Sequence, residues 1–315
     1  GEYPSVTLAE EIDTPGDGQI RGLLTVAGNP VLSVPNGGRL DRALPHLELM
    51  VSVDIYRNET TRHAHYILPP TSQLEQSHYD LAFHLFTVRN TAKFSPPLFA
   101  PPGGKSDFEI LVDLTTHLQA ARRGGIAGRM TRLAGRGVSA LGVDRALDLL
   151  LRLGPHRGLS LGRLRDNPSG VDLGPLEPCL PGRLFTRDGR IQLAPERITV
   201  DMARLERELS SSADQTDASA PNGLLLIGRR QLRTNNSWLH NSHAMIKGRD
   251  RCTLLMHEDD AAARGLTNGS RVALCSRAGR VEVPLQTTTG IRRGVVSLPH
   301  GFGHGREGVP LSRAQ

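Results

Sequence analysis

Short apolar runs alternate with helical apolar spacing in the first part of the chain, and this pattern predicts a parallel sheet. The run Gly22–Ala27 ends at Gly28-Asn29-Pro30, which is typical of a buried strand followed by a turn. Residues 38–49 carry Leu and Ala at helical spacing, and Leu49–Ile55 is a second apolar run. A strand, a helix and a strand within about 30 residues indicate a βαβ unit. We therefore expect two parallel strands, with Ile67-Leu68 as a third.

The middle of the chain is predicted to start with a helix and then to become less regular. Ser106–Glu109 has the spacing of a capping box and precedes apolar residues at helical positions through Leu118. Residues 120–170 are rich in Arg, Leu and Gly, and only Val143–Leu153 among them is predicted to be helical. Glycine and proline in Asp172–Leu180 predict an extended connector.

The last third of the chain changes to short strands. Glu208–Asn222 is rich in Ser, Asp and Ala and lacks apolar periodicity, which predicts a linker. A short helix over Glu258–Arg264 ends at Gly265. The apolar runs that predict strands are Leu224–Ile227, Val272–Ser276, Val281–Leu285 and Val295–Leu298, with a hairpin turn at residues 277–280. We predict an α/β domain over residues 1–220, with a helical and irregular extension from about residue 121, and a small β-barrel-like domain over 221–315.

Composition excludes several classes of protein. The 315 residues carry a net charge of +6, almost all of it from arginine, and only 4% are aromatic. The arginines are spread among acids, so we predict no nucleic-acid partner. No apolar run approaches the roughly 20 residues of a membrane span. Three widely spaced cysteines without a C-x-x-C pair exclude a zinc ribbon or a self-contained iron–sulfur site. With no signal peptide at the first residues, a cytoplasmic location is predicted.

Two motifs are weighed against simpler interpretations. Gly158–Gly162 matches G-x-S-x-G, but a nucleophile elbow needs a strand before it, and a helical Leu/Arg segment with Pro155 stands there instead. His63 and His65 could form a metal pair, and His240, His243, Cys252 and His257 also have metal-ligand chemistry, yet no closed-site spacing is present and lone histidines are more often surface or core residues. We therefore predict neither a hydrolase nor a metal held by protein ligands.

Three side chains near predicted strand and helix ends are candidate binding residues. Asn29 follows the first strand, where a ligand can meet the carboxyl end of a parallel sheet, although an ordinary turn would have the same residues. Asp54 ends the next strand, where a carboxylate can accept ribose hydroxyls or can cap a helix. Asp107 either binds a ligand or only favours the helix dipole beside Ser106.

The segment Gly228–His240 is the most polar loop that follows a predicted strand. It holds three arginines, two asparagines and hydroxyl groups, which are donors for polyphosphates and heterocycle edges. An exposed polar loop is the alternative, and the sole tryptophan, Trp238, argues against it. Pro299–Gly305 is a second, glycine-rich loop that could pack over a ligand.

These residues resemble molybdopterin oxidoreductases of the dimethyl sulfoxide reductase, formate dehydrogenase and nitrate reductase superfamily. The first part resembles their third domain through Gly28–Pro30, Pro35-Asn36, Asp54–Thr60, Leu68-Pro69 and Glu75. The last part resembles their C-terminal dinucleotide-binding domain through Gly228-Arg229, Arg233–His240, Asp260–Gly265, Gly269–Val272, Ser276-Arg277, Gly279 and Gly294–His300. The resemblance implies a parallel-sheet Rossmann-like domain followed by a double-psi β-barrel that is truncated at its C-terminus.

The resemblance also implies the cofactor and its contacts. The expected cofactor is bis-molybdopterin guanine dinucleotide with molybdenum, or alternatively tungsten. Asn29, Asp54 and Asp107 match positions that meet a guanosine moiety in the family. Gln76 stands where some members have Lys, and His65 stands where most have an acid. The loop that cradles pterin and pyrophosphate corresponds to Gly228, Arg229, Arg230, Arg233, Thr234, Asn235 and Asn236.

As a whole, the chain resembles the second half of such an enzyme, and no residue is predicted to be catalytic. The family's iron–sulfur domain, with its 4Fe-4S cluster, and the domain that carries the metal ligand have no counterpart in these residues. The resemblance implies a fragment or split subunit of a molybdenum oxidoreductase, inactive alone, with an electron-transfer partner. The alternative is a non-catalytic dinucleotide-binding or assembly subunit that completes its site with another chain.

Overall fold

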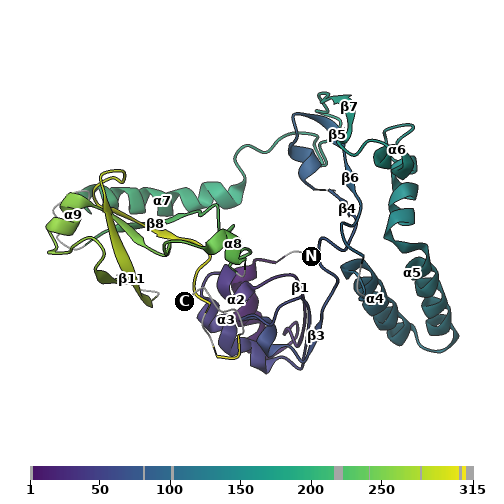
Figure 1. Ribbon diagram of the computed structural model, residues 1–315, viewed down its shortest axis with the longest axis horizontal. Helices are drawn as coiled ribbons and strands as arrows, with labels where there is room; N and C mark the ends of the chain where they lie inside the picture. Colours follow the sequence, from purple (N-terminus) through teal and green to yellow (C-terminus); the bar gives the residue numbers. More distant parts are fainter. Residues whose placement is uncertain are drawn as a thin grey trace. The chain divides into compact units, whose positions relative to one another are not determined.

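The computed structural model describes residues 3–80, 82–100, 103–215, 223–240, 242–276, 279–304 and 307–309 (Figure 1). Its contacts divide the chain into two compact units, Gly1–Pro178 and Cys179–Gln315. This division precedes the domain boundary that composition predicts at residue 220. In the parts that the structure describes, no helix has both the length and the apolar character needed to cross a membrane.

The first unit contains the predicted parallel sheet. Strands β1 (Gly22–Val26), β2 (Leu49–Val53) and β3 (Tyr66–Leu68) are hydrogen-bonded in the order β1-β2-β3. Both pairs are parallel, with Gly22 opposite Leu49 and Val53 opposite Leu68. The parallel arrangement predicted from the apolar runs is thus confirmed for these strands.

Short helices lie before and between these strands and pack against the sheet. They are η1 (Ser5–Thr7), α1 (Leu8–Asp13), α2 (Pro30–Ser33), α3 (Gly37–Ala43), η2 (Leu44–His46) and η3 (Thr61–His63). Ile12 of α1, Leu40 of α3 and Met50 of β2 are almost completely buried in one apolar cluster. The helical spacing predicted between the first two strands is realised as α3 followed by one 3-10 turn.

The rest of the first unit surrounds a second apolar cluster. Short antiparallel pairs join β4 (His78–Tyr79) to β6 (Phe94–Ser95) and β5 (Arg89–Ala92) to β7 (Val171–Pro175). Helices η4 (Phe83–Phe86) and α6 (Leu161–Arg165) lie in the same region. Phe94 and Leu164 are buried there, and the Arg165 guanidinium stands 5.4 Å from the Phe94 ring centroid. The predicted connector therefore begins as a strand, because β5 pairs with it.

Helices α4 (Asp107–Arg123) and α5 (Gly125–Leu153) form a hairpin, and α5 corrects the sequence prediction. Residues 125–141 are helical, although their glycine content predicts irregular chain. A Cβ on Gly128 would lie 2.6 Å from the Ala120 carbonyl oxygen, and one on Gly135 would lie 2.2 Å from Thr116 Oγ1. These glycines allow α5 to pack closely on α4, and that contact supports the helix. Gly142, with φ 75°, interrupts the helix near the predicted start of its second half.

The second unit is built on a mixed five-stranded sheet of order β10-β11-β9-β12-β8. Its strands are β8 (Leu225–Arg229), β9 (Leu254–His257), β10 (Arg271–Ser276), β11 (Gly279–Thr288) and β12 (Val295–Pro299). The predicted hairpin is present as the antiparallel β10–β11 pair, and its residues 277–278 lie outside the described part. Strand β9 was not predicted. The double-psi barrel stays a prediction.

The described residues of this unit also form the helices α7 (Glu196–Gln215), α8 (His243–Ile246) and α9 (Glu258–Ala262). Leu254, Met256 and Val296 are buried among the residues of its core. The predicted linker is wrong over Glu208–Gln215, because these residues continue α7. Residues 216–222 of that linker lie outside the described part.

Candidate functional site

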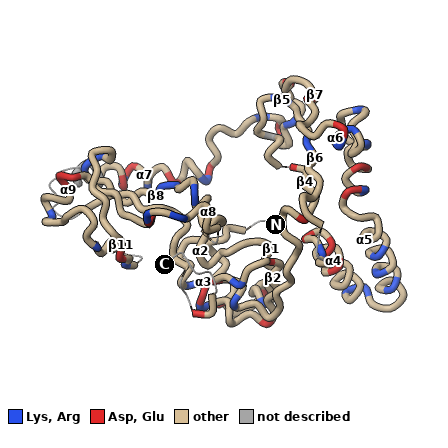
Figure 2. Tube along the Cα trace, in the orientation of Figure 1, with Lys and Arg blue, Asp and Glu red and all other residues tan. Residues whose placement is uncertain are grey.

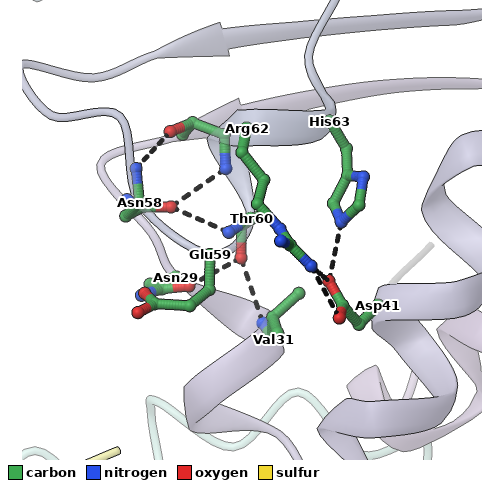
Figure 3. Close-up of polar contacts among 9 residues, drawn as sticks. Asn29, Val31, Asp41, Asn58, Glu59, Thr60, Arg62 and His63 are labelled. Atoms are coloured by element: carbon green, nitrogen blue, oxygen red, sulfur yellow. Dashed lines mark hydrogen bonds and ion pairs between the residues drawn. The ribbon is translucent and has the colours of Figure 1, made fainter. Parts of the chain in front are cut away.

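Asn29 follows β1, and its side chain lies in a hydrogen-bond network with the segment that follows β2 (Figure 3). Its Nδ2 donates to Glu59 Oε2 at 2.7 Å, and its Oδ1 accepts from Thr60 Oγ1 at 2.7 Å. The backbone N–H of Val31 donates to the same Thr60 oxygen at 3.0 Å. Glu59 and Thr60 are fully buried. The network therefore joins the turns at the carboxyl ends of two adjacent parallel strands.

Asp54 lies at the carboxyl end of β2 and is only 8% exposed. Its Oδ1 accepts from the Tyr56 N–H at 2.9 Å, and its Oδ2 accepts from Asn58 Nδ2 at 3.1 Å. Burial raises the pKa of Asp54 despite these hydrogen bonds, which act in the opposite direction. A partly buried carboxylate of this kind favours a ligand that brings hydrogen-bond donors, because such donors stabilise its charged form.

The turn after Asp54 is held by Asn58, which the sequence analysis did not single out. Asn58 Oδ1 accepts from the N–H groups of Thr60 and Thr61, both at 2.9 Å. Its own N–H donates to Thr61 Oγ1 at 2.8 Å, and that hydroxyl donates to the Tyr56 carbonyl at 2.9 Å. Asn favours such local side-chain to backbone bonds. They hold Asp54 in a preformed orientation.

The two histidines considered as a metal pair have protein partners. His63 Nε2 lies 2.6 Å from Asp41 Oδ1, and Arg62 Nη2 donates to both Asp41 oxygens at 2.8 Å (Figure 3). His65 Nδ1 accepts from the Met50 N–H at 2.9 Å. Within the described ranges, no group of three or more His, Cys, Asp or Glu residues is placed to hold a metal ion. The Asp41 contacts instead join α3 to η3.

Asp107 and Gln76 make contacts of their own. Asp107 is the first residue of α4, and the predicted capping box of Ser106 and Glu109 is present. Gln76 Nε2 donates to the Thr71 carbonyl at 2.6 Å and lies 3.4 Å from Asp107 Oδ2. Asp107 thus contacts Gln76. Asn29 and Asp54 lie elsewhere, in the neighbouring turns that follow β1 and β2. The serine of the G-x-S-x-G motif, Ser160, caps α6 by accepting from the Arg163 N–H.

In the second unit, Arg229 anchors the start of the loop over residues 230–240. Its Nη1 donates to the Ser297 carbonyl at 2.5 Å. Its Nη2 donates to the Thr253 carbonyl at 2.6 Å and to Thr253 Oγ1 at 3.0 Å. Burial lowers the pKa of Arg229. The guanidinium therefore ties the end of β8 to β12 and to the residue before β9, which indicates a positioning role.

The other loop residues predicted to bind the cofactor differ in burial and in hydrogen-bond partners. Arg230 pairs with the side chain of Asn236, and Thr234 is buried with its hydroxyl donating to the Gln231 carbonyl at 3.1 Å. Asn235 and Asn236 have left-handed φ values of 41° and 63°, a region that Asn tolerates. Gly228 is exposed, and so are Arg230, Arg233 and Asn235.

The loop over residues 300–304 packs directly on this loop. Gly301 has φ 95°, and a Cβ there would lie 2.3 Å from the backbone carbonyl of Asn236. His240 is only 4% exposed, with ring centroids 4.8 Å from Phe302 and 5.5 Å from His304. Among the described residues, neither ring nitrogen of His240 has a hydrogen-bond partner. Burial, and secondarily His304, lowers the pKa of His240. The sequence places His240 at the end of the polar loop but does not single it out as a cofactor contact, because a lone His near a polar loop carries no specific signal.

Two family profiles match the chain in the order in which its units occur. Residues 1–117 match the profile described as molybdopterin oxidoreductase, and residues 224–313 match the profile described as Molydopterin dinucleotide binding domain. The chain belongs to the molybdopterin oxidoreductase superfamily. The predicted family resemblance is thereby confirmed.

Two known members of this superfamily match this chain over segments of different length. The assimilatory nitrate reductase catalytic subunit of Bacillus subtilis is 31% identical over 118 residues, covering 37% of this chain and 16% of that protein. The F420-dependent formate dehydrogenase subunit alpha of Methanocaldococcus jannaschii is 24% identical over 305 residues, covering 94% of this chain and 41% of that protein. The chain thus spans less than half the length of these relatives.

A solved structure supports the fold. Acetylene hydratase from Pelobacter acetylenicus matches 98% of this chain and 41% of its own, with a TM-score of 0.67 and 15% sequence identity. The likeness extends over both α/β units of this molybdopterin oxidoreductase chain and concerns the fold alone.

Proposed function

We propose that this chain is the cofactor-binding portion of a molybdenum-dependent oxidoreductase and holds bis-molybdopterin guanine dinucleotide. The observation that carries the proposal is Asp54, a largely buried carboxyl group with a raised pKa at the carboxyl end of a parallel strand. Ligands of α/β sheets bind at that edge. The family profiles over residues 1–117 and 224–313 support the same cofactor class.

The first unit suits the guanosine part of the cofactor. The Asp54 carboxylate accepts donors such as the N–H groups of a guanine edge or ribose hydroxyls, and the bonds from Tyr56 and Asn58 orient it for this role. Asn29 already donates to Glu59 through Nδ2, and its Oδ1 accepts from Thr60, so we assign it to shaping the turn beside Asp54. Asp107, next to Gln76, is assigned as a further guanosine contact.

The second unit suits the pterin and pyrophosphate parts. A buried histidine whose ring nitrogens have no protein partner is destabilising unless a ligand or water satisfies it. His240 meets that description within the described residues, and a pterin edge offers both donors and acceptors for it. Exposed Arg233 and the glycine backbone at Gly228 are assigned to the pyrophosphate. Together with Thr234, Asn235 and Asn236, these residues would line the loop that holds the cofactor.

The chemistry belongs to the cofactor, and this chain binds and orients it. When bound, such a cofactor supplies a metal centre, molybdenum or tungsten, that exchanges two electrons or an oxygen atom with a substrate. No residue of this chain is assigned to the reacting atoms. The proposal also covers the fold: a Rossmann-like domain followed by a double-psi barrel domain. The rest of the enzyme, or a partner chain, would carry the 4Fe-4S cluster and the metal ligand. The enzyme would be cytoplasmic and would exchange electrons with a separate electron-transfer partner.

The test compares Asp54→Asn with Asp17→Asn in the polypeptide that carries this chain, isolated with its cofactor. Asp17 is an exposed aspartate and serves as the matched control. We expect Asp54→Asn to lower both the molybdenum content and the guanine nucleotide released on acid hydrolysis by tenfold or more, on the order of 1.4 kcal/mol of binding. Full cofactor content in Asp54→Asn, or an equal loss in both variants, would contradict the assignment.

The size of the native polypeptide separates the two forms of this proposal. An immunoblot of source-cell extract with an antibody to this chain measures it. A band much larger than this chain would support one continuous oxidoreductase. A band of the size of this chain would support the alternative, a dinucleotide-binding or assembly subunit that completes its site with another chain.

A further inference from the structure

The hairpin of α4 and α5 presents two unlike faces near its turn. Gly128 and Gly135 are seven residues apart on α5, and both approach the backbone or side chains of α4 so closely that a Cβ would collide. Residues seven apart occupy the same helix face. This small-residue face of α5 is therefore committed to α4, and the opposite face points away from it.

The opposite face of α5 carries exposed apolar side chains. Ile126, Met130 and Leu133 follow the i, i+4, i+7 pattern of one helix face. They are 81%, 61% and 63% exposed, respectively. Counted at 3.6 residues per turn, this stripe lies on the far side of the helix from Gly128 and Gly135. A stripe of large apolar side chains directed into water indicates a contact with something else.

Arginines accompany this stripe, and their own segment of the sequence contains no acidic residue. Residues 114–143 contain five arginines, no lysine and no acid. They are Arg122, Arg123, Arg129, Arg132 and Arg136, all exposed. Figure 2 shows the blue segments of this end of the hairpin. On either side of this segment, three cations form ion pairs with acids: Lys105–Asp113, Arg152–Asp148 and Arg165–Asp144.

We propose that the end of the α4–α5 hairpin docks on an anionic phospholipid surface, with Ile126, Met130 and Leu133 entering the interface and the five arginines contacting headgroup phosphates. Basic residues beside bulky apolar ones are the combination that holds amphipathic helices at the membrane surface. The surface named by the proposal is negatively charged, which complements an arginine cluster that has no acid within its own segment.

The same features favour a lipid surface over a folded acidic protein. Three apolar side chains offer well under the roughly 800 Å² per partner that a stable protein interface buries. A bilayer needs no matching surface, because acyl chains and headgroups adapt to the side chains that enter them. The proposal is independent of cofactor binding and concerns only where the enzyme is held.

The experiment measures co-sedimentation of the polypeptide that carries this chain with large vesicles. Vesicles of phosphatidylcholine alone are compared with vesicles that contain about 30 mol% phosphatidylserine. We expect binding only to the anionic vesicles, and release at about 0.5 M salt, because electrostatic attraction is then screened within a few ångströms. The triple variant Arg129→Gln, Arg132→Gln, Arg136→Gln should bind about 100-fold more weakly.

Two further variants separate local docking from general charge. Arg183→Gln, Arg187→Gln, Arg190→Gln removes the same charge at exposed positions outside the hairpin and should bind like the wild type. Ile126→Ser, Met130→Ser, Leu133→Ser keeps the charge and should lose at least tenfold, with unchanged helical content by circular dichroism.

Three outcomes would overturn the proposal. The first is absence of binding to anionic vesicles. The second is an equal loss in the hairpin and control arginine variants. The third is binding to poly-glutamate without binding to vesicles, which would assign the hairpin to an acidic protein partner.

Discussion

The two candidate binding regions of this chain differ in how their polar side chains are satisfied. In the first unit, Asn29, Glu59 and Thr60 satisfy one another across two turns, and Asp54 receives two internal hydrogen bonds. In the second unit, His240 is buried without a partner for its ring nitrogens among the described residues. The first region is organised by its own contacts, whereas the second has a hydrogen-bonding capacity that a ligand would satisfy.

This difference predicts opposite responses to removing polar groups. Where side chains bind one another, removing one member leaves its partners buried and unsatisfied. Where a polar side chain has no partner in the protein, an apolar replacement of similar shape removes a penalty instead. Stability and cofactor retention should therefore fall together when the Asn29–Glu59–Thr60 network is broken, and should change in opposite directions when His240 is replaced.

The largest expected effect is that of Thr60→Val. This nearly isosteric change removes the hydroxyl that donates to Asn29 and accepts from the Val31 N–H, so it should lower the free energy of unfolding by about 2–3 kcal/mol. Urea denaturation of the cofactor-free protein measures this. Thr199→Val on the exposed surface of α7 is the matched control and should change stability by less than about 0.5 kcal/mol. A Thr60 variant as stable as the control would show that the network contributes little.

The next effect, in the opposite direction, is that of His240→Phe. The aromatic shape is kept beside Phe302, and the unpartnered nitrogens are removed. The cofactor-free protein should keep its stability or gain up to about 1 kcal/mol, while the cofactor-loaded enzyme should lose bound pterin. Thermal unfolding and fluorescence of the extracted pterin measure the two quantities. Loss of stability without loss of pterin would contradict the comparison.

The same variant should also change the pH dependence of stability. Because the pKa of His240 is lowered in the folded state, the unfolded state binds its proton more tightly between that pKa and 6.5. The wild type should therefore lose stability as pH falls through that window. Midpoints of thermal unfolding between pH 5 and pH 8 should show a smaller decrease for His240→Phe than for the wild type.

The smallest expected effect on stability is that of Asp54→Asn. Its pH dependence is opposite to that of His240. The pKa of Asp54 is raised in the folded state, so the folded protein holds the proton more tightly than the unfolded one, whose model value is 3.8. The stabilisation from the protonated carboxyl is present below that value and is lost as pH rises through the folded pKa. In cofactor-free protein, Asp54→Asn should gain stability relative to the wild type as pH rises through that window. An Asp54→Asn difference that does not change with pH would show that burial does not perturb this carboxyl.

Local patterns were sufficient for part of the fold and part of the site. The parallel strands β1, β2 and β3 and the capping box at Ser106 were predicted because each depends on neighbouring residues: apolar runs, turn residues and a fixed spacing of Ser and Glu. The positions of Asn29 and Asp54 at strand ends followed from the same pattern. Helix α5 was mispredicted, because glycine lowers helix propensity locally and only packing on α4 explains Gly128 and Gly135.

The sequence alone determined the family, the parallel strand order and the chemical types available at the loops, since these follow from residue identity and short-range spacing. Tertiary structure decided which polar groups are satisfied. Thr60 meets Asn29 from 31 residues away, Arg229 is engaged by Ser297 from 68 residues away, and His240 is buried by Phe302 and His304. Burial and partner choice depend on contacts between distant segments, so no local pattern could separate a ligand-binding side chain from one that holds the protein itself together.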